Sequence, residues 1–250
     1  MRTTKEIAEQ ISHDVIKSND LIQRSRFSLS TQQQKIILYL ISKIKPFEEP
    51  HPYVFRIKDF CRVCGLDDTQ GYYYRTLKDE LKKLRDKSVW IKLPNGDEVT
   101  AGWLSKVKIS QATGNVYIDF DVDMLPFLFG LKEQFTRYSL EYVLAMRSKY
   151  AIRLYELIKS HEWQGKTFKT LEDLKIRMDA LNYDRWQDFR RYALEPAVEE
   201  INKYSDIFVS WNELKEGRKV ARIVFNVVHV SGEEINRRRE KRWEKLGIEI

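Results

Sequence analysis

The sequence repeats one succession of predicted elements, and this recurrence is the strongest limit on how the chain can fold. LSTQQQKIILYLIS (29–42) is matched by LAMRSKYAIRLYELIKSH (144–161), and YVFRIKDF (53–60) is matched by KTFKTLEDLKIRMDAL (166–181). Each element of the first half returns about 115 to 119 residues later, in the same order. Solenoid repeats have much shorter periods, of about 20 to 50 residues. The 250-residue chain is therefore predicted to contain a duplicated domain.

Local patterns identify the helices of the first half. Ser30 followed by Gln33 is a capping-box arrangement, which starts a helix, and apolar residues at helical spacing follow it. A short strand-like alternation then leads to a short helix at residues 58–63. A second amphipathic helix begins at Tyr74 and carries leucines on one face, at Leu77, Leu81 and Leu84.

Turn-forming sequences separate β-branched runs in both halves. Residues 94–97 (PNGD) and 113–115 (TGN) favour a hairpin or a three-stranded wing, and Glu216-Gly217 marks the corresponding turn of the second half. The order helix, short strand, helix, helix, hairpin is that of a winged helix-turn-helix domain. We therefore predict an α+β fold with two tandem winged helix-turn-helix domains. Their ranges are 1–130 and 131–232, followed by a basic C-terminal extension at 233–250.

The third helix of the second half lies within LNYDRWQDFRRYALEPAVEEIN (181–202) and carries its arginines at the end where the helix dipole opposes them. With Asp184 as the N-cap and Gln187 at the capping-box position, about 100° per residue places an apolar stripe on one face. The stripe consists of Phe189, Ala193, Leu194, Ala197 and Ile201. The opposite arc carries Arg185, Asp188 and Arg191, with Gln187 at its edge and Arg190 near the stripe.

Contact with DNA would compensate for this unfavourable order, because the third helix of such domains docks in the major groove. A bidentate arginine–guanine contact discriminates by about 1–3 kcal/mol, whereas the dipole costs about 0.3–1 kcal/mol. Base contacts are therefore predicted for this arc, and Arg190, which lies near the stripe, is a weaker candidate. Pro196 leaves two alternatives: the helix bends there, or a separate helix begins with Pro196 in its first turn.

The equivalent arc of the first half has fewer arginines and more aromatic character. It carries Tyr72, Arg75, Thr76, Asp79 and Lys82. We expect weaker or less base-specific DNA contact there, at Tyr72, Arg75, Thr76 and Lys82, or a role in subunit pairing. Two non-identical third helices suit a non-palindromic site that spans two successive major grooves, about one helical turn apart.

The whole pattern resembles the iteron-binding plasmid replication initiators, a family built from two winged-helix domains. The resemblance extends from about Val15 to Val228, and its most specific pieces are LSTQQQKIILYLIS, YDRWQDFRRYALEPAVEEIN and GRKVARIVFNV. It implies a protein that binds direct repeats at a plasmid origin, helps to open an adjacent A·T-rich duplex, and recruits the host initiator ATPase and helicase. Monomers would initiate, and dimers formed through the first domain would repress their own promoter.

The resemblance also implies roles for individual residues. Arg185 and Arg191 match positions expected to reach bases, in the domain that supplies the main sequence contacts. The second wing is expected to contact phosphates through Lys215, Arg218, Lys219 and Arg222. Two other functions stay open: a winged-helix transcriptional repressor without initiator activity, and a protein-interaction adaptor that does not bind DNA.

Patterns that can carry catalytic or metal chemistry are incomplete. Gly165-Lys166-Thr167 resembles the end of a phosphate-binding loop, but Ser160 stands where its first glycine is required. Cys61 and Cys64 form a lone CxxC without a second pair of ligands. Three carboxylates alternate along one predicted strand face, at Asp119, Asp121 and Asp123, and the four histidines are scattered. We predict no cofactor, no metal and no enzymatic activity.

The bulk composition is consistent with a nucleic-acid partner, since the net charge is +7. The basic run at 237–245 is either a phosphate-binding extension or a solvated helix end. Aromatic residues are expected mainly in the core, including Trp103, Phe120, Trp163 and Trp211. Two cysteines and a longest apolar run of six residues, at 36–41, predict a cytoplasmic protein that does not enter a membrane.

Overall fold

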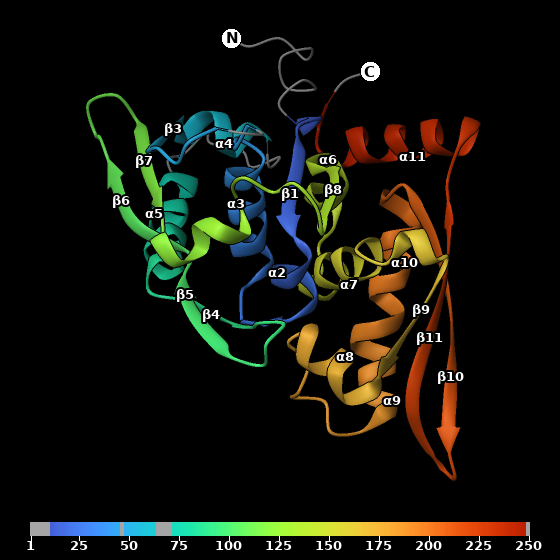
Figure 1. Ribbon diagram of the computed structural model, residues 1–250. Helices are drawn as coiled ribbons and strands as arrows, with labels where there is room; N and C mark the ends of the chain where they lie inside the picture. Colours follow the sequence, from blue (N-terminus) through green and yellow to red (C-terminus); the bar gives the residue numbers. More distant parts are fainter. Residues whose placement is uncertain (1–10, 46–47, 64–71, 249–250) are drawn as a thin grey trace.

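The computed structural model describes residues 11–45, 48–63 and 72–248. Two winged helix-turn-helix units lie side by side, each with a three-helix core and a β-wing (Figure 1). The predicted α+β class and tandem arrangement are confirmed. Among the helices that the structure describes, none is long and apolar enough to cross a membrane.

The first unit begins with a strand and two short elements before its helical core. Its elements are β1 (Asp14–Ser18), α2 (Asn19–Gln23), β2 (Ser25–Arg26), α3 (Thr31–Ile41), β3 (Tyr53–Arg56), α4 (Ile57–Val63), α5 (Tyr72–Arg85), β4 (Ser88–Lys92), β5 (Glu98–Gly102), β6 (Leu104–Ile109), β7 (Asn115–Phe120) and the 3₁₀ helix η1 (Val122–Phe127).

The second unit follows the same plan and ends in an additional helix. Its elements are β8 (Phe135–Ser139), α6 (Leu140–Ala145), α7 (Lys149–Lys159), the 3₁₀ helix η2 (Glu162–Gln164), β9 (Lys166–Thr170), α8 (Leu171–Arg177), α9 (Trp186–Phe189), the π-helical turn η3 (Arg190–Leu194), α10 (Glu195–Tyr204), β10 (Ile207–Glu216), β11 (Lys219–His229) and α11 (Gly232–Lys245).

The duplication extends to the capping of individual helices. The hydroxyls of Ser30 and Ser148 accept backbone N–H groups at the starts of α3 and α7. At the other ends, the Ser42 hydroxyl donates to the Tyr39 carbonyl and the Ser160 hydroxyl donates to the Leu157 carbonyl, each at 2.8 Å. Side-chain capping satisfies backbone groups that have no partner within the helix. The predicted capping box at Ser30 and Gln33 is present.

The two wings share one strand order, and the first unit adds a second small sheet. The sheet β3-β7-β6 corresponds to β9-β11-β10, while β4 and β5 pair with β2 instead of joining the wing. The predicted turns lie between β4 and β5, between β6 and β7, and between β10 and β11. Gly96, Gly114 and Gly217 have positive φ there, at 96°, 65° and 63°, which glycine adopts without steric cost.

An antiparallel pair formed by β1 and β8 joins the units, and the sequence patterns did not predict it. Asp14 pairs with Ser139 and Ser18 pairs with Phe135, so the register centres on Ile16 and Arg137. Each strand ends in a serine and is followed directly by a helix. Equivalent strands of the two units therefore face each other about a local pseudo-two-fold axis, as in an isologous interface.

Most predicted core aromatics are buried, with one exception. Trp103 and Phe120 are buried and Trp211 is partly buried, but 83% of Trp163 is exposed. Trp163 lies in η2, a turn of three residues that projects from the end of α7 and has no buried face. The core prediction for Trp163 is therefore wrong. Cys61 is buried in the core, as expected, whereas Cys64 lies outside the described residues.

The basic run at 237–245 forms most of α11, and two of its arginines are buried. Arg238 donates through Nη1 to the carbonyl oxygens of Ser205 (3.1 Å) and Ile207 (2.8 Å). Arg242 donates through Nη2 to Glu141 Oε1 at 2.8 Å. These residues attach α11 to the end of α10 and to α6. Neither a phosphate-binding role nor a solvated helix end describes them, so both alternatives are wrong for these two arginines.

A partly buried histidine beside η2 predicts a pH effect on stability. Burial, followed by the charge of Lys169, lowers the pKa of His161 from 6.5 to about 4. The unfolded chain therefore binds more protons between these two values, and the free energy of unfolding decreases as the pH falls through that range. We expect His161→Gln to reduce this decrease, with no change in pH dependence above pH 6.5. Urea unfolding at about pH 7 and about pH 5 measures it; equal decreases in both proteins would contradict it.

Candidate nucleic-acid interface

The third helix of the second unit is continuous but not uniform. We call residues 186–204, comprising α9, η3 and α10, the recognition helix. Its N-cap is Arg185, without a side-chain capping bond, so the prediction of Asp184 as the cap is wrong by one residue. The predicted core stripe is confirmed, since Phe189, Ala193, Leu194, Ala197 and Ile201 are all buried.

A π-helical turn accommodates Pro196. Proline has no backbone N–H, and its ring collides with the carbonyl four residues earlier in an ordinary α-helix. Here the Glu195 N–H bonds to the Arg190 carbonyl five residues earlier, and backbone dihedrals remain helical through the turn. Pro196 thus lies in the first turn of α10, without a break before it. The second alternative is therefore right to place Pro196 in the first turn of α10 and wrong to separate α10 from the turn before it. The wide turn also shifts Arg190 and Arg191 away from the positions that uniform helical spacing predicts.

The loop before the recognition helix is held by a buried lysine. Lys175 on α8 is 9% exposed, and its Nζ donates to the carbonyl oxygens of Tyr183 (2.6 Å) and Asp184 (3.3 Å). The Tyr183 ring stacks against Tyr192, with centroids 6.4 Å apart. These contacts fix the path of the loop, and with it the position of the helix N-terminus.

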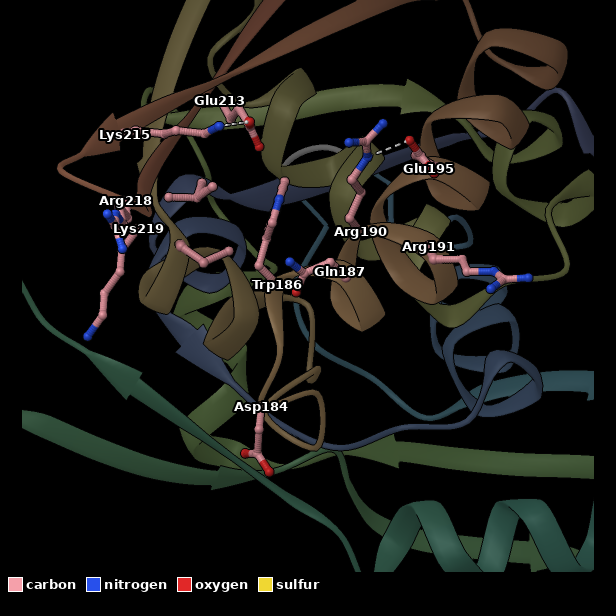
Figure 2. A pocket seen from close by; sticks show the side chains of 12 residues that line it. Asp184, Trp186, Gln187, Arg190, Arg191, Glu195, Glu213, Lys215, Arg218 and Lys219 are labelled. Atoms are coloured by element: carbon pink, nitrogen blue, oxygen red, sulfur yellow. Dashed lines mark hydrogen bonds and ion pairs between the residues drawn. The ribbon is translucent and has the colours of Figure 1, made fainter.

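A concave surface of about 940 Å³ lies between the recognition helix and the second wing. It collects predicted residues from both elements (Figure 2). The predicted residues that line it are Gln187, Arg190, Arg191, Lys215, Arg218 and Lys219. Trp186 lies between the two groups of cations, and Asp184 lies at the lower edge of the view, in the loop before the helix. Helix and wing thus form one cationic surface.

Three other predicted residues of the second unit lie outside this lining. The side chain of Arg185 is 75% exposed, and its Nε lies 3.9 Å from the carboxylate of half-exposed Asp188. Arg222 is exposed on β11, opposite Leu214 and Thr170 in the sheet. All three are accessible, but they are not part of the concave surface.

The two arginines of the π-helical turn differ in their electrostatic surroundings. Arg190 donates through Nε to Glu195 Oε1 at 2.8 Å, and its guanidinium carbon lies 5.5 Å from the centre of the Trp211 ring. Arg191 points away from Arg190 and from the wing (Figure 2), and its guanidinium carbon lies 5.4 Å from the Tyr192 ring centre. No carboxylate among the described residues pairs with Arg191. Its charge is therefore available to an anion.

The wing tip supplies further uncompensated charge. Gly217 makes the turn between β10 and β11, and Arg218 and Lys219 follow it with exposed side chains. The register of the two strands shifts between Leu214 and Lys215. Lys215 pairs with Glu213 at 3.0 Å, whereas Arg218 and Lys219 have no carboxylate partner among the residues that the structure describes.

The first unit has a smaller basic hollow in the equivalent place. It occupies about 330 Å³ between α5 and β6, and its basic residues are Lys78, Lys82 and Arg85. Of the predicted residues, Lys82 lines it, Arg75 is exposed elsewhere on α5, and Thr76 is half-buried. The Tyr72 side chain lies outside the part of the chain that is described. Lys78 and Arg85 were missed, although basic residues at i, i+4 and i+7 share one helix face.

One cluster in the second unit has residue types that bind metals. Ligand atoms of Glu162, Asp206 and His229 lie within 4.8 Å of one another. The ammonium of Lys159 lies between both carboxylates, 2.6 Å from each, and His229 pairs with Glu162. The Lys159 ammonium thus already occupies the space between these acids and offsets part of their charge. The aspartates weighed as a metal site from sequence are not part of it, and Asp121 instead caps η1.

Comparisons with known proteins agree with this geometry. A model of the initiator replication protein WH1 domain matches residues 14–159, and a model of the initiator Rep protein WH2 domain matches residues 170–227. An uncharacterised 27.6 kDa protein of Escherichia coli is 27% identical over 130 residues, which are 51% of this chain and 54% of that protein. The chain thus matches about half the length of this relative.

Two further comparisons cover most of the chain. The PI protein of Escherichia coli is 24% identical, over 88% of this chain and 86% of its own length. The crystal structure of the Pi initiator protein in complex with iteron DNA superposes with a TM-score of 0.72 at 21% identity, covering 89% of this chain and 99% of that chain. At this identity, the likeness shows that the two proteins share a fold.

Proposed function

Because the chain belongs to the initiator replication protein family, we propose that it binds iteron-type direct repeats at a replication origin through both winged helices. The observation that carries this proposal is the single concave surface on which cations of the recognition helix and the second wing meet. A helix that enters the major groove while its wing follows the backbone combines base contacts with phosphate contacts. The Pi initiator protein, which shares the fold, has been crystallised with iteron DNA.

We assign the main base contacts to the N-terminal half of the recognition helix. Arg191 is the leading candidate because its charge is unpaired, and Gln187 lines the same concave surface. Arg190 contributes less, because it must first give up its bond to Glu195. Arg185, Asp188 and Arg222 are accessible outside the concave surface, and we assign them contacts with DNA at the edge of the interface.

The wing tip and the first unit supply phosphate contacts. Arg218 and Lys219 project from the second wing, with Lys215 at its base. In the first unit we assign contact with the DNA phosphates to Lys82. Lys78 and Arg85 line the same hollow, and we assign them the same role. Arg75, Thr76 and Tyr72 remain proposed contacts of the same helix. The two helices differ in sequence, which favours a direct, non-palindromic repeat.

Further parts of the proposal rest on the family alone. These are recruitment of the host initiator ATPase and helicase, a monomer–dimer equilibrium through the first unit, and repression by the dimer. The proposed cytoplasmic location rests instead on the two cysteines and the short apolar runs. The role is one of binding and assembly, without a catalytic step.

Selection from random duplexes followed by salt titration tests the proposal. We expect one preferred, non-palindromic sequence. About six phosphate contacts give a slope near −5 for log affinity against log salt. A flat response would favour the adaptor, which does not bind DNA. Repressor and initiator are separated by asking whether the gene supports maintenance of its replicon. A chain that binds specifically but does not support maintenance is a repressor.

The first-unit hollow gives a prediction for salt dependence. Combined replacement of Lys78, Lys82 and Arg85 by alanine should weaken binding to all duplexes alike and reduce the magnitude of the salt slope by about 2 to 3. Lys83→Ala is the matched control, because Lys83 lies on the same helix but pairs with Glu80 at 2.8 Å. If the triple variant keeps the full salt slope of the wild-type chain, this hollow does not contact the DNA phosphates.

A further inference from the structure

The segment that leads into α3 contacts α7, α8 and the turns beside them in the second unit. We call residues 23–34 the junction segment. At the two ends of α7, Gln23 Nε2 donates to Ser160 Oγ at 3.1 Å, and Thr31 Oγ1 donates to the carbonyl of Arg147, just before the α7 N-cap, at 3.0 Å. On α8, Arg177 Nη1 donates to the Ser25 carbonyl at 3.0 Å. In the turn after α8, Asp179 Oδ2 accepts from Ser28 Oγ at 2.9 Å. The junction segment thus holds the second helix-turn-helix from one side.

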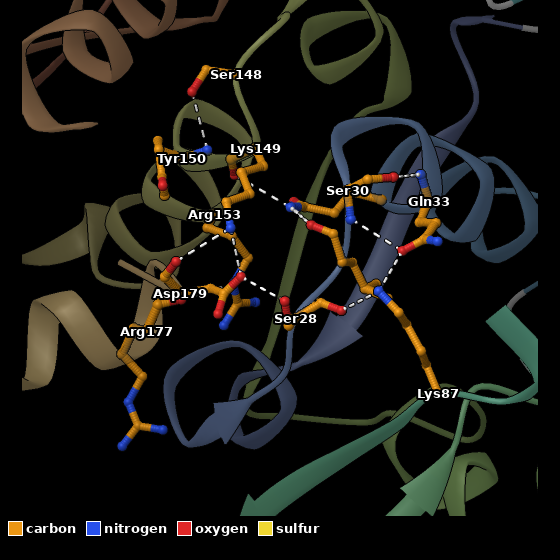
Figure 3. A network of polar contacts seen from close by, with 12 residues as sticks. Ser28, Ser30, Gln33, Lys87, Ser148, Lys149, Tyr150, Arg153, Arg177 and Asp179 are labelled. Atoms are coloured by element: carbon orange, nitrogen blue, oxygen red, sulfur yellow. Dashed lines mark hydrogen bonds and ion pairs between the residues drawn. The ribbon is translucent and has the colours of Figure 1, made fainter. Parts of the chain in front are cut away.

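The same segment is tied to the third helix of the first unit. Lys87, just after α5, donates through Nζ to the Ser28 carbonyl at 2.7 Å and to Gln33 Oε1 at 2.9 Å. Gln33 Nε2 donates in turn to Glu80 Oε2 on α5, at 2.8 Å. Ser28 therefore lies in the middle of a polar chain that runs from α5 to the turn before the recognition helix (Figure 3).

Asp179, at the far end of this chain, has an unusual backbone. Its φ is +55°, and its carboxylate lies between the Ser28 hydroxyl and the Lys149 ammonium, which is 2.7 Å away. Among the described residues, seven glycines have positive φ, and the non-glycine exceptions are Asp179 and Gln134. Both are at contacts between the units, since the Gln134 carbonyl accepts the Asn19 N–H at 2.7 Å. Glycine would be the least strained residue at 179, so the carboxylate is the reason to expect aspartate there.

We propose that the Ser28–Asp179 contact fixes the separation and rotation of the two DNA-binding helices, and so determines the spacing of the DNA site that the chain accepts. This inference rests on the proposed DNA binding. One inserted base pair moves one half-site by about 3.4 Å and rotates it by about 35° around the duplex axis. A chain with a fixed joint must distort either the DNA or itself to follow that change, whereas a chain with a loosened joint follows it at low cost.

Asp179→Gly and Ser28→Ala are the test variants. Glycine keeps the left-handed backbone and removes only the carboxylate, so Asp179→Gly is expected to fold. Gln134→Gly is the matched control, because it makes the same kind of backbone change at the other positive-φ contact and keeps the carbonyl that bonds to Asn19. Each half-site is the part of the selected duplex that one unit binds. Dissociation constants are measured for the selected duplex, for the same duplex with one base pair inserted or removed between the half-sites, and for the half-site of the second unit alone.

We expect the wild-type chain and Gln134→Gly to prefer the selected spacing by at least about tenfold. Asp179→Gly and Ser28→Ala should reduce this preference to about threefold or less, with unchanged affinity for the half-site. Full spacing preference in both variants would overturn the inference alone, and so would an equal loss of affinity on all duplexes. Absence of any preferred duplex for the wild-type chain would instead overturn the proposed function, and this inference with it.

Discussion

Replacing Arg191 by alanine is expected to weaken binding to the preferred duplex by about 1–3 kcal/mol and to relax the preference at one base pair. Arg191 lies in the π-helical turn of the recognition helix, exposed and without a carboxylate partner among the described residues. Its guanidinium therefore gives up no bond to a carboxylate when it contacts a guanine edge. Dissociation constants on the preferred duplex, on single-base variants and on random duplex measure the effect.

Arg190→Ala and Lys219→Ala are the controls for this prediction. Arg190 is bonded to Glu195, so part of its contact with DNA only replaces an existing charge-assisted bond, and its loss should cost less than the loss of Arg191. Lys219 lies at the wing tip, where a phosphate contact affects all sequences alike. If Arg191→Ala and Lys219→Ala weaken preferred and random duplexes equally, the distinction between base and phosphate contacts is wrong.

The duplicated plan and the apolar face of the recognition helix could be predicted because local chemistry determines them. The capping box at Ser30 and the core stripe of Phe189 to Ile201 depend on residues a few positions apart. The π-helical turn could not be placed from spacing alone. Pro196 signalled a disturbance, but a kink, a break and a widened turn all relieve the same clash.

Contacts between distant segments were beyond the reach of sequence patterns. The strands β1 and β8 are five residues long and carry buried polar side chains, Lys17 and Thr136, so they show no simple apolar alternation. Arg238 and Arg242 looked like surface charge because their partners, the carbonyl oxygens at the end of α10 and Glu141, are far away in sequence. Long-range pairing of this kind has no local signature.

Removing the carboxylate of Glu156 is expected to cause the largest loss of stability, about 3–5 kcal/mol in the free energy of unfolding. Lys17 on β1 forms an ion pair with Glu156 on α7, and both side chains are 2% exposed. The Tyr138 hydroxyl on β8 donates to the same carboxylate, and burial, followed by Glu156, raises the pKa of Tyr138 well above its usual value. In Glu156→Gln, Lys17 is left buried without an anionic partner. Urea unfolding at about pH 7 measures the loss.

The double variant Lys17→Met, Glu156→Gln separates the cost of an unpaired charge from the value of the pair itself. Methionine fills a similar volume without charge, and the glutamine carbonyl still accepts the Tyr138 hydroxyl. Because desolvation offsets most of the attraction in a buried ion pair, we expect the double variant to recover part of the stability that Glu156→Gln loses. The remainder is the cost at Arg153, which is also buried and whose Nη1 lies 3.9 Å from the Glu156 carboxylate. If the losses of stability in Lys17→Met and in Glu156→Gln sum to the loss in the double variant, Lys17 and Glu156 act independently. Strong coupling would mean that the β1–β8 junction tolerates an apolar replacement but not half of an ion pair.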